Sequence, residues 1–289
     1  MPADMEIPRG SWDCHTHIFA PSGEGPPLDA AAYAPPAGHF TMHREMLAAL
    51  GFERALLVQP SLYGTDHSVL LASLARSGGQ LRGIGSCPVS TTEADLHHLR
   101  SQGVIAMRFV GVLGPGGGAY PGTQGLDVLE HLYPALSAAG MQVHLWADLE
   151  TCTSLASSAA TGNLPIVLDH LGGLSPEDTP GTPRFDRFAD ALSSGMAWVK
   201  LTYLRRSRQP GEYEDIRPVV EALAERVPEQ IIWGSDWPFV RLDPPPNGAR
   251  LVRLLSEWLG PEIFALCLRD NPDRLIAWGE HLDAAEAGP

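Results

Sequence analysis

Two histidines separated by one residue give the first indication of chemistry in this chain. His15 and His17 lie in the short run WDCHTHIFAP, residues 12–21. Side chains at positions i and i+2 of a strand point to the same face, so a strand here would direct both imidazoles at one place. Such a pair can hold a divalent metal ion that activates water, or it can donate hydrogen bonds to a substrate carbonyl.

Further polar side chains follow other short apolar runs along the chain. They are Gln59, Ser61, Tyr63, Arg108, His144, Asp169, His170, Lys200, Tyr203, Arg205, Arg206, Ser235 and Asp236. Asp236 is suited to act as a general base, because nearby imidazoles tune the pKa of a carboxyl group. The planar guanidinium groups of Arg108 and Arg206 can each bind a carboxylate through two hydrogen bonds. The set therefore predicts an acid–base site for an anionic substrate.

Some members of this set also have an ordinary structural interpretation. His144 can be a packing residue, and Lys200 can be the partner in a structural ion pair. Asp169 can simply orient its neighbour His170. These interpretations do not account for the whole set, because so many polar residues at strand ends would require several independent coincidences.

Other polar and aromatic residues are expected to have no chemical role. Arg205 is predicted to be a solvated neighbour of Arg206, and Trp233 and Trp237 are predicted to be walls or core. Histidines in segments with helical spacing are expected on the surface; these are His43, His67, His97, His98 and His131.

Eight short runs rich in apolar and β-branched residues recur along the chain and are predicted to be strands. They cover residues 11–20, 54–61, 81–89, 104–112, 141–148, 164–173, 197–204 and 230–239. Segments with helical spacing lie between most of them, and several end in glycine. These segments cover residues 40–52, 66–79, 92–103, 126–140, 152–162, 185–195 and 216–227.

Alternation of strands and helices favours a parallel sheet, and eight such units predict an α/β fold, a (β/α)8 TIM barrel. The alternative is a doubly wound open sheet, which is disfavoured because no glycine-rich phosphate loop follows the first strand. Loops rich in proline and glycine cover residues 20–38, 111–125 and 241–248. Each follows a predicted strand, where barrels build their active sites. A lid or a subunit contact is a possible role for the first two loops.

Length and composition are consistent with one barrel domain over residues 1–289, closed by a C-terminal helical extension. The chain is 44% hydrophobic, which is ample for a buried core. No apolar run approaches ~18 residues, and the N-terminus lacks the order of a signal peptide, so we expect a cytoplasmic protein with no membrane segment.

Charge and cysteine content exclude several other classes of site. The formal net charge is −14, from 34 acidic and 20 basic residues, so nucleic acids and anionic membranes are not expected as partners. The four cysteines lie far apart without a CxxC motif, which disfavours a zinc–thiolate or disulfide framework. The oligomeric state stays open.

The pattern as a whole resembles the amidohydrolase superfamily, in which HxH follows the first strand, histidine the sixth and aspartate the eighth. The resemblance is greatest to the amidohydrolase-2 type and its 2-pyrone-4,6-dicarboxylate lactonase group. The segments that carry it span residues 11–280, and they are YAPPAG, LGFERALLVQPSLYGTDH, LRGIG, MRFVG, VLDHLGG, WVKLTYLRRS and IIWGSDWP.

This resemblance implies a hydrolase that opens the ring of a small carboxylated lactone without a metal. Asp236 would deprotonate water, and three histidines would polarise the scissile carbonyl, namely His15, His17 and His170. The substrate's acidic groups would be bound by Tyr33, Ser61, Arg108 and Arg206, with His144 also facing the substrate.

Two departures from the lactonase pattern leave alternatives open. The lactonase has a second arginine six residues after the first, where this chain has Gly114. In zinc-dependent decarboxylases of the superfamily, a strand-five histidine is a metal ligand, so a single zinc ion on His15, His17, His144 and Asp236 is the alternative cofactor. A bridging lysine or glutamate at strand four is absent, so we expect no two-metal site. A barrel that binds carboxylates without turning them over is a third possibility.

Overall fold

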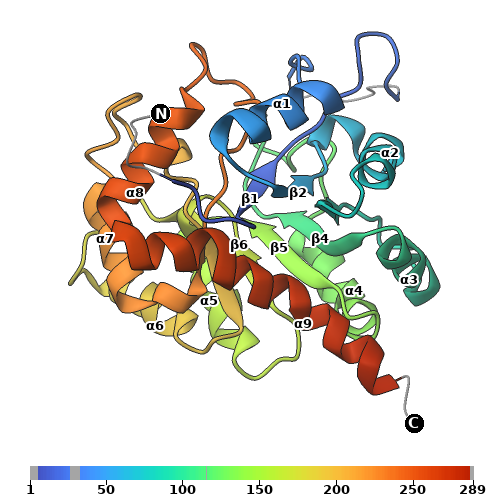
Figure 1. Cartoon of the computed structure of the whole chain (residues 1–289). Coiled ribbons are helices and arrows are strands. Elements are labelled where there is room, and N and C mark those ends of the chain that lie inside the picture. The colour runs from blue at the N-terminus through green and yellow to red at the C-terminus, as the bar shows by residue number, and fades with distance from the viewer. Residues whose placement is uncertain (1–5, 27–32, 115, 287–289) are drawn as a thin grey trace.

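Eight parallel strands form the centre of the computed structural model, which describes residues 6–26, 33–114 and 116–286 (Figure 1). They are paired in chain order from β1 to β8. Their bounds are β1 (Trp12–Thr16), β2 (Arg54–Val58), β3 (Leu81–Gly85), β4 (Val104–Val110), β5 (Gln142–Trp146), β6 (Ile166–Leu168), β7 (Ala197–Lys200) and β8 (Ile231–Ile232). The predicted runs contain all eight strands, although β6 and β8 are shorter than expected.

Helices connect the strands and cover the outside of the sheet (Figure 1). They are α1 (Phe40–Leu50), α2 (Ser68–Arg76), α3 (Glu93–Ser101), α4 (Leu126–Ala138), α5 (Leu149–Ala159), α6 (Pro183–Leu192), α7 (Arg217–Arg226), α8 (Gly248–Ala265) and α9 (Asn271–Glu286). Short 3-10 turns are η1 (Ser61–Tyr63), η2 (His170–Gly173), η3 (Tyr203–Arg205) and η4 (Pro228–Gln230), and η5 (Leu266–Asp270) is a π-helical turn between α8 and α9. The predicted (β/α)8 barrel is confirmed.

Backbone hydrogen bonds join β1 to the end of β8 and so bring the barrel close to closure. The amide of Cys14 donates to Trp233 O at 2.9 Å, and the amide of Asp236 donates to His15 O at 2.8 Å. Gly234 lies between these two bonds, where a Cβ atom would come within 2.4 Å of His15 Cβ. Glycine is therefore required at this position, because only a backbone without a side chain can approach β1 so closely.

A β-bulge in β1 determines which of its side chains face the barrel interior. The register with β2 shifts between Asp13 and Thr16, so one extra residue is inserted on β1. Cys14 packs with the apolar residues of the lower barrel, whereas the next residue, His15, faces the polar residues of the upper barrel. Before the bulge, the even-numbered residues of β1 face the interior. After it the odd-numbered residues do, so His15 and His17 both point inward.

The N-terminal end of α9 covers the floor of the barrel. Leu275 and Ile276 belong to a buried apolar cluster with residues of seven strands, and Gln142 Nε2 donates to Leu275 O at 2.7 Å. Asn271 Nδ2 donates to Pro228 O and to Ile231 O at 2.8 Å each, which anchors α9 beside β8. The C-terminal helices therefore complete the hydrophobic core on the side opposite the loops that follow the strands.

Above this floor lies a layer of buried polar side chains inside the barrel. Asp169 follows β6 and contacts Lys200 Nζ at 3.0 Å and Arg108 Nε at 2.8 Å. His15 Nδ1 lies 3.2 Å from Lys200 Nζ and 3.3 Å from Asp169 Oδ1. His144 is also fully buried, and register pairs it with Arg108 on the neighbouring strand. A cluster of one carboxylate and two cations therefore lies at the boundary between the apolar floor and the polar upper part of the barrel.

Opposing effects determine the charge of this layer. Burial alone would raise the pKa of Asp169, but Lys200 and Arg108 hold that pKa well below its ordinary value. Lys200 is confirmed as a structural ion-pair partner. The interpretation that Asp169 merely orients His170 is wrong, because its carboxylate binds two cations from β4 and β7.

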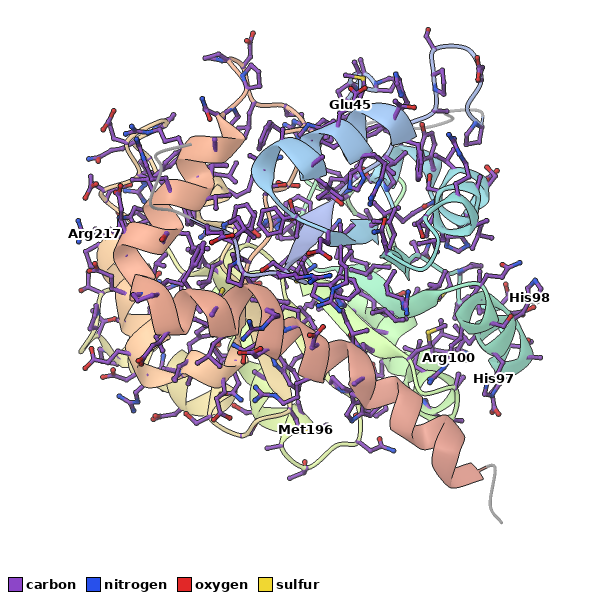
Figure 2. The ribbon with its side chains drawn as sticks, in the orientation of Figure 1. Glu45, His97, His98, Arg100, Met196 and Arg217 are labelled. Carbon is purple, nitrogen blue, oxygen red and sulfur yellow. The ribbon has the colours of Figure 1, made fainter. Side chains whose placement is uncertain are left out.

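The helical histidines divide into surface and core residues. His97 and His98 lie on the outer side of α3 (Figure 2), and His131 is also exposed, so these predictions are confirmed. The surface prediction is wrong for His43, which is fully buried, and His67 is half-buried. His43 Nε2 donates to Thr16 Oγ1 at 2.9 Å, since that hydroxyl itself donates to a backbone carbonyl of β2. α1 is amphipathic, and helical spacing alone does not show that His43 lies on its inner face.

No helix in the described ranges has the length and apolar content needed to cross a bilayer. The described residues of the three predicted loops follow β1, β4 and β8, and they are 20–26 with 33–38, 111–114 with 116–125, and 241–248. Within the second loop, Leu113 and Ala119 form an isolated antiparallel bridge. In this fold, the loops that follow the strands build the mouth of the barrel.

Replacing His43 by glutamine is expected to make the protein more resistant to acid. Burial and the neighbouring Arg44 lower the pKa of His43 from 6.5 to about 3, so below pH 6.5 protons bind preferentially to the unfolded chain and stability falls. The free energy of unfolding of His43→Gln relative to wild type should rise by about 2 to 3 kcal/mol between pH 7.5 and pH 4.5. Urea denaturation at both pH values measures this free energy, and the exposed variant His131→Gln is the control. An equal change in the free energy of unfolding of both variants would contradict the lowered pKa of His43.

Replacing Lys200 by methionine is expected to destabilise the barrel by about 3 to 5 kcal/mol, because it removes one cation from a buried carboxylate. The double variant Lys200→Met/Asp169→Asn should recover more than ~1 kcal/mol of this loss, since the unbalanced charge is then gone. Chemical denaturation of the three proteins gives the comparison. Arg226→Met, which breaks an exposed pair with Asp190, is the matched control and should change stability by less than ~1 kcal/mol.

Candidate functional site

A cavity of about 350 Å³ opens at the carboxyl ends of the strands. This volume suits a small-molecule ligand. Eight of the nine predicted site residues line it, all except His144. The lining residues are His15, His17, Tyr33, Ser61, Arg108, Tyr120, Trp146, His170, Arg205, Arg206, Asp236, Val240 and Arg241.

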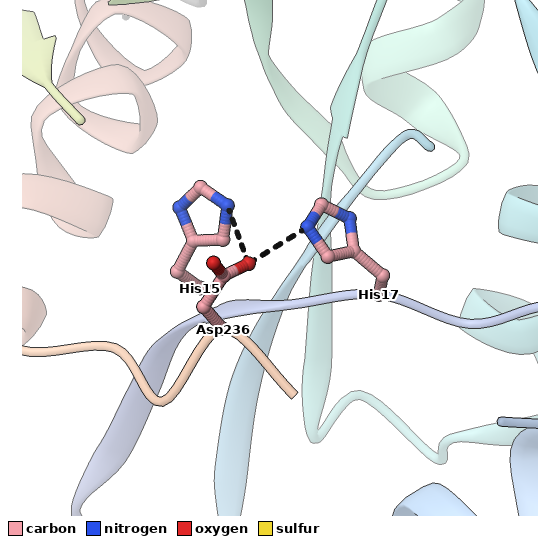
Figure 3. Close-up of side chains that lie close together, drawn as sticks. All are labelled: His15, His17 and Asp236. Carbon is pink, nitrogen blue, oxygen red and sulfur yellow. Dashed lines mark hydrogen bonds and ion pairs between the residues drawn. The ribbon is translucent and has the colours of Figure 1, made fainter. Parts of the chain in front are cut away.

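Three side chains converge at the base of the cavity, as Figure 3 shows. Asp236 Oδ1 lies 3.1 Å from His17 Nε2 and 3.6 Å from His15 Nε2. The two imidazole centroids are 5.1 Å apart. The bulge in β1 and the close approach at Gly234 produce this cluster, because they turn both histidines inward and bring the end of β8 against them.

The contacts of His17 restrict its protonation. Its Nδ1 lies 2.8 Å from Val58 O and its Nε2 lies 3.1 Å from Asp236 Oδ1, so each ring nitrogen faces an acceptor. Both contacts are hydrogen bonds only if the ring is an imidazolium. A metal cation between Nε2 and the carboxylate would satisfy the same geometry, with Nδ1–H still donating to the carbonyl.

The contacts of His15 favour one tautomer of its ring. Burial, then the Lys200 charge, lower the pKa of His15 well below its ordinary value, so the ring is neutral. Lys200 Nζ donates to Nδ1, which places the ring proton on Nε2. Nε2 is buried and has no hydrogen-bond partner among the described residues, so this N–H is available to an oxygen atom in the cavity.

Asp236 is held as a carboxylate. Burial would raise its pKa, but Arg205, followed by His17 and the other imidazoles, keeps that pKa well below its ordinary value. Arg205 Nε donates to Asp236 Oδ2, and Arg205 Nη1 donates to Val240 O at 2.8 Å. The prediction that Arg205 is a solvated neighbour of Arg206 is therefore wrong, because η3 turns its side chain into the cavity.

Two of the polar residues occupy left-handed backbone conformations. Asp236 has φ of 61° and His170 has φ of 51°. Such angles are costly for residues other than glycine and concentrate at functional sites. Burial lowers the pKa of His170 to about 4, so its ring is neutral at the cavity wall, packed edge-on against Trp146 at 5.7 Å.

One side of the cavity offers donors for a carboxylate. Tyr33 forms a hydrogen bond with Ser61, and burial raises the pKa of the tyrosine to about 12, so it stays protonated. Arg108 uses Nε for Asp169 and lies 5.4 Å from the Trp146 ring centroid. Its terminal nitrogens have no hydrogen-bond partner among the described residues, and the side chain belongs to the cavity lining.

Arg206 lines the cavity but is also part of the loop structure around η2. Its Nε donates to Leu174 O at 2.6 Å, and its Nη2 donates to Gly173 O at 2.5 Å. Two of its donors are therefore committed to backbone carbonyls. Arg206 fixes the η2 turn that carries His170, and only part of its guanidinium faces a ligand.

His144 is not among the cavity-lining residues. Neither ring nitrogen has a hydrogen-bond partner in the described structure, and burial, then Lys200, lower its pKa well below the ordinary value. The donor atoms close enough together to hold a metal ion belong to His15, His17 and Asp236, within 4.8 Å of one another, or to His15, Asp169 and His170. His144 belongs to neither group.

The first of these groups fits a single zinc ion. Two imidazoles and a carboxylate are ligands that zinc prefers, and three protein ligands leave one position for water. Ligation by His15 Nε2 would require the ring proton on Nδ1, where Asp169 Oδ1 at 3.3 Å can accept it. His15, His17 and Asp236 would hold such an ion, and when bound it would supply a water of lowered pKa.

Four lining residues were not singled out by the sequence patterns: Tyr120, Trp146, Val240 and Arg241. Tyr120 belongs to the glycine-rich loop after β4. In that loop a Cβ atom at Gly114 would lie 3.0 Å from Pro121 Cδ and 3.1 Å from Ala119 O, so a larger residue at this position would require the loop to move. Trp146 is the last residue of β5 and lies two residues before the end of the predicted strand at 141–148, which was a positional signal.

Comparisons with known proteins found relatives that match nearly the whole chain. The 4-sulfomuconolactone hydrolase of Hydrogenophaga intermedia is 30% identical over 280 residues, covering 95% of this chain and 91% of the relative. The 2-pyrone-4,6-dicarboxylate hydrolase of Comamonas testosteroni is 26% identical and covers 96% and 93%, respectively. A crystal structure of a probable 2-pyrone-4,6-dicarboxylic acid hydrolase from Acinetobacter baumannii, with citric acid bound, has the same fold, with a TM-score of 0.77 at 23% identity over 93% of this chain and 99% of that one.

A family model described as amidohydrolase matches residues 12–278, from the first strand to the last helix. The match includes the strand ends that carry the histidines and Asp236. The chain therefore belongs to the amidohydrolase family and is a hydrolase built on a (β/α)8 barrel.

Proposed function

We propose that this hydrolase opens the lactone ring of a small carboxylated substrate, with Asp236 as the base that activates water. The observation that carries this proposal is the ionised Asp236 carboxylate between His15 and His17 at the base of a substrate-sized cavity. The relatives named as hydrolases of 4-sulfomuconolactone and of a pyrone dicarboxylate support a cyclic ester as the substrate class.

Hydrolysis begins with attack of water on the ring carbonyl. Asp236 accepts one proton from the water while the water oxygen bonds to the carbonyl carbon. The π electrons of the C=O bond move onto the carbonyl oxygen. His15 Nε2–H lies beside that carboxylate and donates to the developing oxyanion, whereas His17, whose ring nitrogens face Val58 O and Asp236 Oδ1, holds the carboxylate in place. His170 is a further donor at the wall. The tetrahedral intermediate then collapses, the ring C–O bond breaks, and the leaving oxygen takes the proton from Asp236.

Lys200 and Arg205 are positioning residues for this reaction. Lys200 donates to His15 Nδ1 and so keeps the proton of that ring on Nε2, where the carbonyl oxygen would lie. Arg205 binds Asp236 Oδ2 and leaves Oδ1 facing the imidazoles. A base with a strongly lowered pKa is weak but stays ionised in acid, so its contribution depends on the donors that polarise the carbonyl.

Binding of an acidic substituent is assigned to the side of the cavity that carries Arg108. The hydroxyl groups of Tyr33 and Ser61 lie in the same lining as this guanidinium, and together they can donate several hydrogen bonds to one carboxylate. Arg206 contributes charge from the opposite loop. This arrangement would hold the ring with its carbonyl toward His15 and His17.

A zinc-dependent decarboxylase or hydrolase is the second candidate. The observation that favours it is the acceptor on each side of the His17 ring, which a cation at Nε2 would explain as well as a proton does. The ligand set would be His15, His17 and Asp236, without the predicted fourth ligand His144. A non-catalytic carboxylate-binding barrel would leave the left-handed Asp236 without a role, together with the three side chains that contact its carboxylate, His15, His17 and Arg205.

Replacing Asp236 by asparagine is expected to lower kcat for lactone hydrolysis by at least 10²- to 10⁴-fold, because the water then lacks its base. The test substrates are 4-sulfomuconolactone and 2-pyrone-4,6-dicarboxylate, with ring opening followed by absorbance. Asp127→Asn, an exposed aspartate in the first turn of α4, is the control and should keep wild-type activity. An active, folded Asp236→Asn protein would exclude Asp236 as the base.

Metal content distinguishes the two chemistries. For the lactonase we expect less than ~0.1 zinc per chain in protein purified without added metal, and activity that survives a chelator. Inductively coupled plasma mass spectrometry measures the ion, and the same sample is assayed before and after dialysis against a chelator. About one zinc per chain with chelator-sensitive activity would replace the imidazolium interpretation of His17 with zinc ligation.

A further inference from the structure

The charge of the cavity lining is opposite to that of the chain. The lining contains four arginines and one carboxylate, an excess of three positive charges before any histidine is counted, although the net charge of the chain is −14. Asp169 and Lys200 beneath the cavity balance each other. Such a local concentration of cations in an acidic protein raises the occupancy of a multiply charged anion at that place.

These four arginines differ in how far their charge is already compensated. Arg108 is paired with Asp169, and Arg205 is paired with Asp236. Arg206 donates twice to backbone carbonyls. Arg241 has no carboxylate partner in the ranges that the structure describes, and its only hydrogen bond there is from Nη1 to Tyr120 OH, at 3.0 Å. Its Nε and Nη2 groups are therefore free to donate to a ligand.

The chain around Arg241 is shaped so that this side chain reaches the cavity. Arg241 has φ of 62°, a left-handed conformation that is unfavourable for arginine by roughly 1 kcal/mol or more. The preceding carbonyl, Val240 O, is fixed by Arg205 Nη1 at 2.8 Å. The position of this loop is thus tied to the arginine that holds Asp236, and the guanidinium of Arg241 lies at the rim of the same cavity.

Tyr120 is fixed from the other side of the cavity. It is buried, and its ring packs on Trp146 with centroids 5.1 Å apart. Its hydroxyl oxygen accepts from Arg241, so its own proton is available to a second acceptor. Arg241 and Tyr120 therefore present adjacent donors, one charged and one neutral, to the same space.

We propose that Arg241 and Tyr120 form a second anion-binding subsite, which recognises a carboxylate or sulfonate on the part of the ligand remote from Arg108. The subsite joins two loops, one after β4 and one after β8, across the mouth. The subsite rests on the proposed function only for the statement that the ligand is a lactone, because an anion can bind there without being turned over. Arg241 and Tyr120 would make the enzyme selective for ligands with two acidic groups.

Binding of matched anions tests this subsite without any reaction. The probes are glutarate and isophthalate, each compared with its monomethyl ester, which has nearly the same shape and one charge fewer. Isothermal titration calorimetry on wild type should show that each diacid binds at least 10-fold more tightly than its ester. In Arg241→Gln the diacids should weaken by about 10- to 100-fold and the esters by less than 3-fold.

Two further variants separate a direct contact from a structural effect. Tyr120→Phe should weaken the diacids by about 3- to 10-fold, because one neutral donor is lost. Arg241→Lys should restore part of the selectivity, since it keeps the charge but not the planar fork. Arg187→Gln, which removes an exposed arginine on α6, is the control and should leave all four affinities unchanged.

The outcomes distinguish this inference from the proposed reaction. The subsite would be overturned if Arg241→Gln weakens binding of diacid and ester equally in both probe pairs, or weakens neither. This holds even if the protein hydrolyses lactones. Selective weakening of the diacids in a protein that opens no lactone would support the subsite and overturn the proposed reaction.

Discussion

The buried carboxylate of Asp169 is the interaction on which the rest of the site depends. A charge inside a barrel is tolerated only with compensating cations, and Lys200 and Arg108 supply them from two other strands. Each cation then has a second function. Lys200 sets the ring proton of His15, and Arg108 projects its free nitrogens into the cavity. The ion cluster therefore connects the stability of the barrel to the orientation of the groups that face a substrate.

Sequence patterns were sufficient to predict the architecture and most of the lining. β4 is a run of apolar and β-branched residues, and Arg108 lies in its carboxyl-terminal half. Because the carboxyl ends of parallel strands meet at one mouth, Asp236 and His15 were expected to be neighbours, as they are in the structure.

Features that depend on exact backbone geometry were not visible in the sequence. The bulge in β1 is an insertion of one residue into the register, and WDCHTH contains no glycine or proline to mark it. The prediction that Arg205 is solvated was wrong because its guanidinium donates to Asp236 after the η3 turn, a contact that no periodicity in the sequence indicates. Arg241 and Tyr120 lie in loops, where neither helical nor strand periodicity indicates which side chain turns inward.

The floor made by α9 has a consequence for the order in which the protein can be assembled. Every residue that lines the cavity precedes position 242, whereas Leu275 and Ile276 close the hydrophobic bottom of the barrel. During synthesis, all the groups of the site therefore leave the ribosome before the residues that cover the core beneath them. Until α9 docks, the inward-facing apolar side chains at the lower ends of the strands are open to water, and such transiently exposed surface makes an unfinished barrel prone to aggregation.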